Sequence, residues 1–237
     1  MVKYLTLLSY LLCGQINAQS LTAENIIDNS IAFHDPKNEL FSNDYSFHFD
    51  ESRPDGSSRT SIVLLGPKSE RFEIASQREG RLITYKIEKE NLKMFLDDNE
   101  NITEEDIKKY RFSPERGMMI KNYYLYLWHL PRKLKDPGTI VGKTVAEESF
   151  NGYECCKIKV TYTEAVGKDI WYFYFDKESF QLRGYRFYHD EAANDGEYIY
   201  LDKLVEIDNV KIPAKRDWYT NKEDEFLGSD LLTKISK

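Results

Sequence analysis

Strand-like patterns recur five times in the first half of the chain. In the first segment, Tyr45, Phe47 and Phe49 alternate with polar neighbours. The other four segments lie at residues 60–65, 71–74, 83–87 and 92–96. Turn signals separate the segments, among them Pro54-Asp55-Gly56 and Gly80. Period-two alternation between such turns predicts an antiparallel meander of short strands. Residues 62–65 are all apolar, which predicts a central strand there.

Helical spacing appears in two other stretches. Thr22 is a candidate N-cap for a helix that continues to His34, where apolar residues recur every four positions. A second helical region interrupts the strands between residues 101 and 135, and Ser113-Pro114 marks the start of its main helix. The stretch from Met118 to Leu130 is rich in Met, Tyr and Trp on both faces. A helix this aromatic must be covered by protein, or must itself cover something apolar.

Strand patterns resume at Thr139 and continue to the end of the chain. Asn151-Gly152 predicts a type I′ hairpin, and Trp171, Phe173 and Phe175 again alternate with other residues. We expect about six strands here, and about eleven in the whole chain. No composition shift or internal repeat divides the sequence. The prediction is one mainly β, antiparallel domain over residues 19–237 with a few inserted helices.

The first 18 residues are predicted to be a secretory signal peptide. A basic Lys3 precedes an apolar stretch that is too short to span a membrane, and Ala18 supplies a small residue before the expected cleavage site. An alternative is a lipoprotein signal, in which Cys13 would be acylated and anchor the chain in the outer membrane. Leu12 stands where such a signal has a small residue, so ordinary cleavage is favoured. The protein is therefore expected to be exported, with the periplasm as its compartment.

Composition excludes several classes of function. The 237 residues carry 33 Lys and Arg against 40 Asp and Glu, a formal charge of −7. An acidic chain lacks the basic surface that nucleic-acid binding requires, and no apolar run is long enough for a transmembrane span. The most prominent feature of the composition is its aromatic content of 14%, with 17 Tyr, 13 Phe and 3 Trp. We expect a monomer.

Two cysteines, Cys155 and Cys156, remain after removal of the signal peptide. Neighbouring residues of a strand point to opposite faces, and a disulfide between them would close a strained ring. We interpret them as separate thiols. Alternation places Cys156 with the apolar Ile158 and Val160, so Cys156 is expected to be buried and Cys155 to be the more exposed thiol.

Catalytic and metal-binding signatures are absent from the sequence. There is no G-x-S-x-G, H-E-x-x-H, C-x-x-C or phosphate-binding glycine loop. His189 with Asp190 and Glu191 could form a metal or acid–base cluster, although turns at strand ends collect such residues without a function. His34 is expected to be a cation at a helix C-terminus. The sequence predicts no enzyme, no cofactor and no metal site.

Several stretches resemble a known group of exported proteins. They are Ile31-Ala32-Phe33-His34-Asp35-Pro36, Phe150-Asn151-Gly152-Tyr153-Glu154-Cys155, Tyr172-Phe173-Tyr174-Phe175-Asp176, Tyr188-His189-Asp190-Glu191, Asp195-Gly196-Glu197-Tyr198, Ile212-Pro213 and Phe226-Leu227-Gly228. With the strand pattern and the central helices, they resemble the LolA/LolB-like superfamily of outer-membrane lipoprotein-sorting proteins. More narrowly, the chain is similar to an uncharacterised LolA-like family of exported Gram-negative bacterial proteins.

This resemblance implies an open antiparallel half-barrel with helices as a lid over an apolar concave face, where lipids or lipoprotein acyl chains bind. The lipoprotein carrier has an arginine inside its cavity that holds the lid, and no arginine of this sequence is assigned that role. Helical spacing places one set of lid residues on a common face, and alternation places a strand set on a common side. The predicted ligand-binding residues are Phe47, Phe49, Ile62, Leu64, Met119, Tyr123, Tyr126, Leu127 and Leu130.

The expected function is that of a non-enzymatic exported carrier of lipids or acyl chains, with envelope proteins as potential partners. One alternative is an envelope scaffold that binds protein or glycan and whose core is filled, with no lipid cavity. The other is a hydrolase that uses His189. An open apolar groove under the helix of residues 118–130 would favour the carrier.

Overall fold

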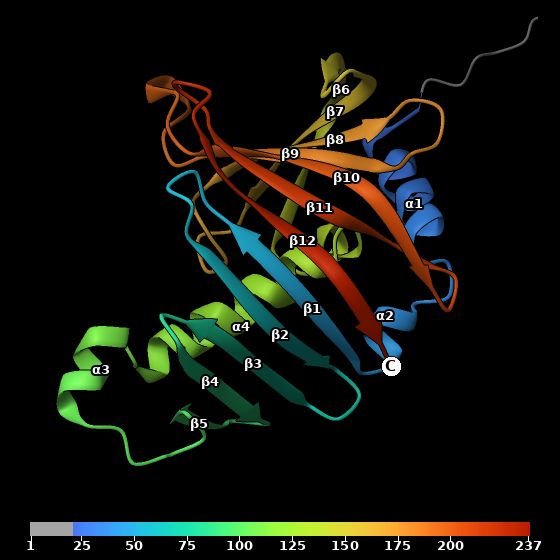
Figure 1. The fold of residues 1–237 in the computed structure, drawn as a ribbon. Helices are drawn as coiled ribbons and strands as arrows, with labels where there is room; N and C mark the ends of the chain where they lie inside the picture. The colour runs from blue at the N-terminus through green and yellow to red at the C-terminus, as the bar shows by residue number, and fades with distance from the viewer. Residues whose placement is uncertain (1–20) are drawn as a thin grey trace, which may run out of the picture.

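Twelve antiparallel strands form one continuous sheet in the computed structural model, which describes residues 21–237 (Figure 1). The strands are β1 (Tyr45–Ser52), β2 (Ser58–Gly66), β3 (Arg71–Arg78), β4 (Arg81–Glu88), β5 (Asn91–Leu96), β6 (Thr139–Phe150), β7 (Tyr153–Tyr162), β8 (Ile170–Asp176), β9 (Leu182–Tyr188), β10 (Glu197–Ile207), β11 (Val210–Thr220) and β12 (Phe226–Ser236). The predicted signal peptide, with Cys13, lies outside the described residues.

The strand order explains why the sheet stays open. It runs β5-β4-β3-β2-β1-β12-β11-β10-β9-β8-β7-β6, so the first meander grows outward from β1 and the second returns to pair β12 with β1. Within residues 21–237 the two edge strands, β5 and β6, do not pair with each other. The expected open, mainly β, antiparallel architecture is confirmed. The strand count is twelve rather than about eleven, because seven strands follow the helical insertion.

The two predicted helical regions are present, and the short helices at residues 39–42 and 191–193 were not predicted. They are α1 (Ala23–His34), α2 (Glu39–Ser42), α3 (Glu104–Tyr110) and α4 (Pro114–Trp128), with short 3₁₀ helices η1 (Arg132–Lys135) and η2 (Glu191–Ala193). The hydroxyl of Thr22 accepts a hydrogen bond from the Asn25 amide at 3.2 Å, and that of Ser113 accepts one from the Arg116 amide at 3.1 Å. Both residues therefore act as the predicted N-caps.

The main core lies between one face of the sheet, here called the concave face, and the helices α1 and α4. The helix α4 crosses the strands β1 to β4 on that face (Figure 1). Its Trp128 packs against the rings of Phe47 and Phe49, with centroids 5.3 and 4.6 Å away, and Tyr124 packs against Phe72 at 6.3 Å. The C-terminal half of α4 therefore covers a filled aromatic core rather than a cavity.

A second, smaller cluster lies on the convex face and buries the thiol that we expected to be exposed. It comprises Phe150, Cys155, Tyr174 and Tyr198, and the Phe150 and Tyr174 rings stack at 3.7 Å. Cys155 is 0% exposed and Cys156 is 7% exposed, and both are free thiols. The prediction of a more exposed Cys155 is wrong because aromatic side chains from the flanking strands β6 and β8 and from β10 cover the convex face above it.

Candidate ligand-binding groove

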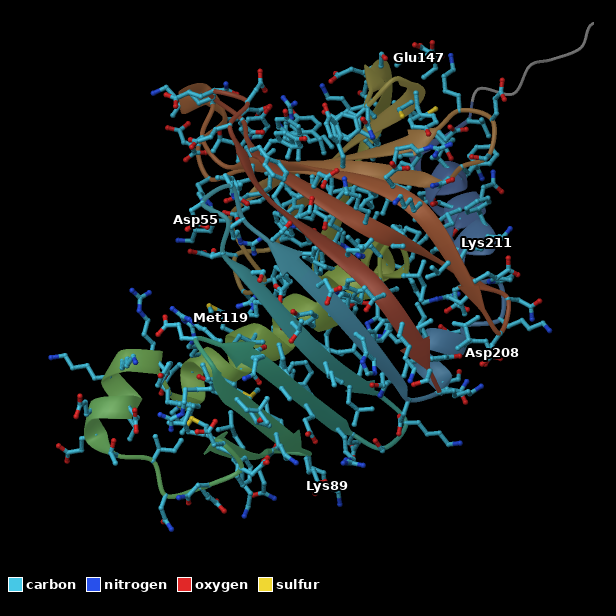
Figure 2. The ribbon with its side chains drawn as sticks, in the orientation of Figure 1. Asp55, Lys89, Met119, Glu147, Asp208 and Lys211 are labelled. Atoms are coloured by element: carbon cyan, nitrogen blue, oxygen red, sulfur yellow. The ribbon has the colours of Figure 1, made fainter. Side chains whose placement is uncertain are left out.

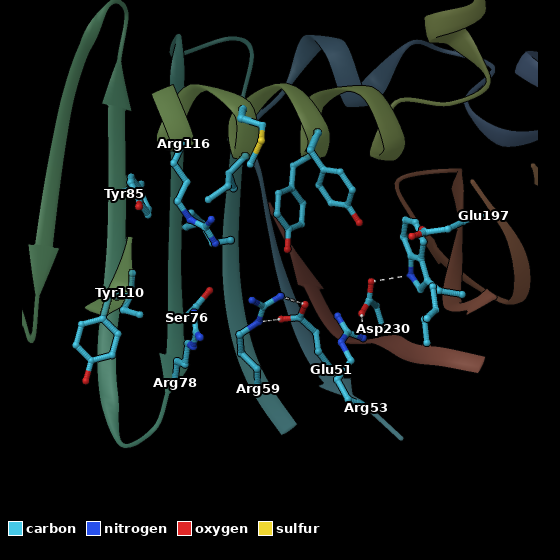
Figure 3. A pocket seen from close by; sticks show the side chains of 18 residues that line it. Glu51, Arg53, Arg59, Ser76, Arg78, Tyr85, Tyr110, Arg116, Glu197 and Asp230 are labelled. Carbon is cyan, nitrogen blue, oxygen red and sulfur yellow. Dashed lines mark hydrogen bonds and ion pairs between the residues drawn. The ribbon is translucent and has the colours of Figure 1, made fainter. Parts of the chain in front are cut away.

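A groove of about 450 Å³ lies between α4 and the concave face of strands β1 to β4 (Figure 3). Its volume is within the range of roughly 300–1,000 Å³ that is typical of small-molecule sites. The apolar part of its lining includes Ile74 and Ile83 from the sheet, Met119, Ile120, Tyr123 and Tyr124 from α4, and Leu227. The groove therefore opens at the N-terminal half of α4, beyond the filled core around Trp128.

One glycine sets the distance between α4 and the sheet at this end. Gly117 is buried, and a Cβ atom at this position would lie 2.5 Å from Leu92 Cδ1 and 2.8 Å from Tyr85 Cδ1. A larger residue would clash with both side chains. Gly117 thus lets the helix approach β4 and β5 closely, so that the groove is bounded on this side by the ring of Tyr85.

Charged residues form a row across the concave face, and Arg59, Glu51 and Asp230 of this row line the floor of the groove. Glu51 of β1 pairs in register with Arg59 of β2 on one side and with Asp230 of β12 on the other, and Asp230 pairs with Arg216 of β11. Directly paired residues of antiparallel strands share a face, so all four side chains belong to the concave face. Across the four adjacent strands β2, β1, β12 and β11, two central carboxylates are flanked by an arginine on each side.

Glu51 is the more buried of the two carboxylates in this row, with 5% of its surface exposed. The Arg59 guanidinium donates two hydrogen bonds to its carboxylate, and the Ser61 hydroxyl donates another at 2.7 Å. The hydroxyls of Ser61 and Ser76 are 2.9 Å apart and continue the network. The carboxylate is satisfied by charged and neutral donors, as a buried charge must be.

Asp230 lies beside this pair in the same floor. The Trp218 indole donates a hydrogen bond to one carboxylate oxygen at 3.0 Å, and Arg53 lies 3.4 Å from the other. Burial, and then the nearby charge of Glu51, raise the pKa of Asp230 above its usual value. The floor of the groove is therefore polar, while α4 supplies an apolar roof.

Tyr123 and Tyr124 extend from α4 over this floor. Burial raises the pKa of Tyr124 strongly, and the charge of Glu51 adds to the shift. Burial also raises the pKa of Tyr123 well above 10, although 40% of its side-chain surface is exposed. The two observations agree if its hydroxyl end is enclosed while its ring edge forms the rim. Both phenols are neutral at physiological pH.

The sheet holds the other end of α4 through Arg216. This residue is 3% exposed, and its guanidinium carbon lies 3.4 Å from the centroid of the Trp128 indole. One of its nitrogens donates a hydrogen bond to the Pro213 carbonyl at 3.2 Å. The sequence did contain a signal for this residue: an arginine interrupts the inward-facing apolar series Val210, Ile212 and Ala214 of β11.

Comparison with known proteins identifies the family. The model of the family of unknown function DUF6503 matches residues 3–235. The chain belongs to this family. Comparison with curated proteins finds no match. The DUF6503 chain is similar in structure to a LolA superfamily protein from Nitrosomonas europaea, at 10% identity and a TM-score of 0.55, over 92% of this chain and 94% of that one.

Two further solved structures resemble the DUF6503 chain. One is a domain from Vibrio parahaemolyticus described as that of an outer membrane lipoprotein-sorting protein, at 9% identity and a TM-score of 0.51, covering 89% of this chain and 90% of that one. The other is a DUF1329 family protein from Desulfovibrio piger, at 11% identity and a TM-score of 0.53, covering 90% and 91%. At this identity the likeness establishes the fold, and the expected LolA-like fold is confirmed.

The structure brings only part of the predicted ligand-binding set to the groove. Met119 and Tyr123 line it, and Met119 is 59% exposed on the part of α4 far from α1 (Figure 2). Phe47, Phe49 and Leu127 are buried in the filled core next to it. The charged floor was missed entirely, because Asp230 joins Glu51 and Arg59 only through the pairing of β12 with β1, two strands far apart in the sequence.

Two other members of the predicted set lie on the concave side but outside the groove. The Tyr126 hydroxyl bonds to that of Tyr162, and its ring lies 5.6 Å from Trp171, so it packs toward β7 and β8. Leu130 lines a cavity of only about 20 Å³ between α1, α2 and η1. Neither residue lines the groove.

Ile62 and Leu64 lie on the wrong side of the sheet for the predicted site. Phe47 pairs with Val63 and Phe49 with Ser61, so the concave residues of β2 are the odd-numbered ones. Ile62 is 46% exposed on the convex face. The sequence alone could not show which residues of β2 face the concave side. Residues 62–65 are all apolar, so no polar residues mark the outward-facing positions.

Among the candidate polar residues, His34 differs from expectation and His189 has a partner other than its neighbouring carboxylates. His34 is not a cation: burial lowers its pKa to about 4, its Nδ1 lies 2.7 Å from the Lys211 carbonyl, and its Nε2 accepts a hydrogen bond from the Leu182 amide. His189 pairs with Asp169 at 2.8 Å rather than with Asp190 or Glu191.

Residues 21–237 contain no group of His, Cys, Asp and Glu suited to a metal ion. In the same residues, no helix is long and apolar enough to cross a membrane.

Proposed function

We propose that this protein is a non-enzymatic carrier that binds a lipid or acyl chain in the groove under the N-terminal half of α4. The observation that carries the proposal is the groove itself, with an apolar roof on a helix and an opening at the exposed Met119. The likeness to a LolA superfamily protein and to a lipoprotein-sorting domain supports a carrier over an enzyme.

The physical chemistry of the lining fits such a ligand. Each CH₂ group that leaves water gains roughly 0.8 kcal/mol, so a short enclosed segment of chain already binds measurably. Met119 is flexible and polarizable, and the flat rings of Tyr123 and Trp218 stack with centroids 6.3 Å apart at the rim. Side chains of this kind adapt to chains of different length.

The filled core limits how the ligand can bind. Trp128, Phe47 and Phe49 occupy the centre of the concave face, so a chain would lie along the outer part of α4 rather than pass through the half-barrel. The ligand would then be partly exposed, as suits a carrier that must release it. Export to the periplasm, through the predicted signal peptide or through acylation of Cys13, belongs to the same proposal.

Lipid extraction tests the proposal without assuming a ligand. The protein would be purified from the periplasm under native conditions and extracted with organic solvent, and the extract analysed by mass spectrometry. An unrelated protein purified from the same fraction is the control. We expect at least one amphiphile at near-stoichiometric amount in the sample and not in the control. Equal, trace lipid in both samples would contradict carriage.

The convex face favours a second candidate function. Tyr153, Tyr172, Tyr200 and Tyr219 are half-buried around the convex aromatic cluster, and several rings remain accessible at their edges. Such tyrosine platforms suit protein or glycan contacts, so an envelope scaffold is the alternative. Binding of a glycan that persists when the groove is blocked would favour the scaffold.

A further inference from the structure

We infer that one end of the groove is a binding site for the anionic head of the ligand, so that the preferred ligand is an amphiphile with a carboxylate or phosphate group. The site consists of Arg116, Arg78 and Tyr85. This inference rests on the proposed function, because it names the ligand class of the same groove.

The arginines that line the groove differ in whether a carboxylate lies within ion-pair distance of their guanidinium groups. Four arginines and three carboxylates line it. The floor carboxylates already have partners: Glu51 binds Arg59, and Asp230 lies beside Arg53. Among residues 21–237, the guanidinium of Arg116 has no carboxylate within ion-pair distance. It extends from the first turn of α4 into the space between the helix and the sheet (Figure 3).

Arg78 adds a second positive charge at the same end. Alternation along β3 places Arg78 on the same, concave side of the sheet as Ile74 and Ser76. Its only ion pair among the described residues is a contact of 3.8 Å with Glu79, which is itself shared with Lys109 at 3.7 Å. The third carboxylate of the groove, Glu197, lies at the opposite end (Figure 3). The groove is therefore positive at the end formed by β3, β4 and α4.

An unpartnered buried hydroxyl points to the same place. Tyr85 is 2% exposed and lines the groove, yet its hydroxyl has no hydrogen bond of ordinary geometry within the described part of the chain. A buried polar atom without a partner is costly, and a ligand atom can supply the missing bond. Burial raises the pKa of Tyr85, so the phenol remains a hydrogen-bond donor. The charge of Arg116, together with N–H donors of Arg116 and of the Ser113 backbone close to the phenol, opposes that shift.

These three groups match a small anion. A guanidinium offers paired N–H donors in the geometry that a carboxylate or phosphate accepts, and the Tyr85 phenol offers a further donor. With the head at this end, the chain would extend along the apolar roof toward Tyr123 and Trp218. A carboxylate and a phosphate share this chemistry, so both are tested.

Competition with an uncharged fluorescent probe separates head from tail. The probe is N-phenyl-1-naphthylamine, and the competitors are decanoate, decyl phosphate and 1-decanol, which share one chain length. The variants are Arg116→Gln and Arg78→Gln, with Lys121→Gln as the matched control, because Lys121 is on α4 but does not line the groove. Circular dichroism and a thermal melt would confirm that each variant is folded.

The expected result is that decanoate or decyl phosphate displaces the probe at concentrations about tenfold lower than 1-decanol. In Arg116→Gln this advantage shrinks to about twofold, while the affinity for 1-decanol and the behaviour of Lys121→Gln stay unchanged. Whichever of the two anions is preferred identifies the head group. If Arg116→Gln does not fold, the exposed Arg78→Gln gives the same test, with a loss of about threefold.

Two results would overturn the inference, and they differ in what else they affect. If 1-decanol competes as well as the anions in the wild type, the head-group site does not exist and the carrier proposal stands. The same holds if the arginine variants keep the full preference for anions. If neither the probe nor any competitor binds, the carrier proposal fails together with the inference.

Discussion

The guanidinium of Arg216 lies over the indole of Trp128, with its carbon 3.4 Å from the ring centroid, and so joins the sheet to the C-terminal end of α4. Both side chains are buried. Among the described residues, no carboxylate forms an ion pair with Arg216, although Asp230 is its register partner. A buried cation is tolerated here because an aromatic face and the Pro213 carbonyl replace part of its hydration.

A double-mutant cycle tests this contact. A desolvated cation–π pair contributes about 2 kcal/mol, so Arg216→Met and Trp128→Phe should show a coupling free energy of this order in urea unfolding. Arg216→Lys should recover only part of it, because an ammonium lacks the flat face that stacks on the ring. Additive effects of the two single substitutions would mean that the stacking does not hold the helix.

The ion pair in the groove floor gives a second prediction. Arg59→Met leaves Glu51 buried without its charged partner, and we expect a loss of about 3 kcal/mol in the free energy of unfolding. The double variant Glu51→Gln with Arg59→Met should recover most of this loss. As the matched control, Arg71→Met removes an exposed pair with Glu88 and should cost less than about 1 kcal/mol. Equal losses in the two single variants would contradict the account.

The lowered pKa of the buried His34 should make the free energy of unfolding depend on pH. The unfolded state takes up a proton near pH 6.5, whereas burial holds the folded-state pKa at about 4. Since the unfolded state then binds more protons, stability falls as the pH drops from about 6.5 to 4, by up to about 3 kcal/mol. Carboxylates contribute in the same range, so the quantity to measure is the difference between wild type and His34→Gln. A pH profile of the same slope in both proteins would show that His34 does not titrate in this way.

The two cysteines should both resist labelling in the folded protein. Burial raises the pKa of Cys155 to about 12 and also raises that of Cys156, so neither is a thiolate at neutral pH. We expect no more than slow reaction with Ellman's reagent under native conditions, and two thiols released in urea by the chain without residues 1–18. Rapid modification of either cysteine in the native state would contradict the packing of that strand.

Local patterns were sufficient for most of the fold. The alternation of Tyr45, Phe47 and Phe49 predicted an inward-facing strand, Asn151-Gly152 has the two positive φ angles of the predicted turn, and Thr22 and Ser113 cap their helices. Each of these features depends only on neighbours in the sequence. The pattern therefore carried enough information to predict an open antiparallel sheet with central helices.

The site depended on information that local patterns do not contain. Glu51 and Asp230 are adjacent only because β12 returns to pair with β1, and nothing in either segment specifies that register. The inward side of residues 62–65 is likewise set by the pairing of Phe47 with Val63. Cys155 is buried by Tyr174 and Tyr198 from other strands. Long-range pairing decided each position that the sequence left open or misplaced.

The central claim is that the acyl chain of a lipid ligand binds against the outer part of α4. Two adjacent methionines of this helix provide the test. Met119 lines the groove and is 59% exposed, whereas Met118 is 39% exposed and does not line it. Replacing either methionine with glutamate should leave the protein folded, because both side chains are exposed, whereas a charge at the buried Leu127 should unfold it.

The measurement is a titration of a fluorescent fatty acid into wild type, Met119→Glu and Met118→Glu. A carboxylate at the groove wall would have to lose water against the chain, so Met119→Glu should bind at least about tenfold more weakly, equivalent to about 1.4 kcal/mol. Met118→Glu should bind like the wild type. A wild type without saturable binding, or two variants that bind equally well, would contradict the carrier function.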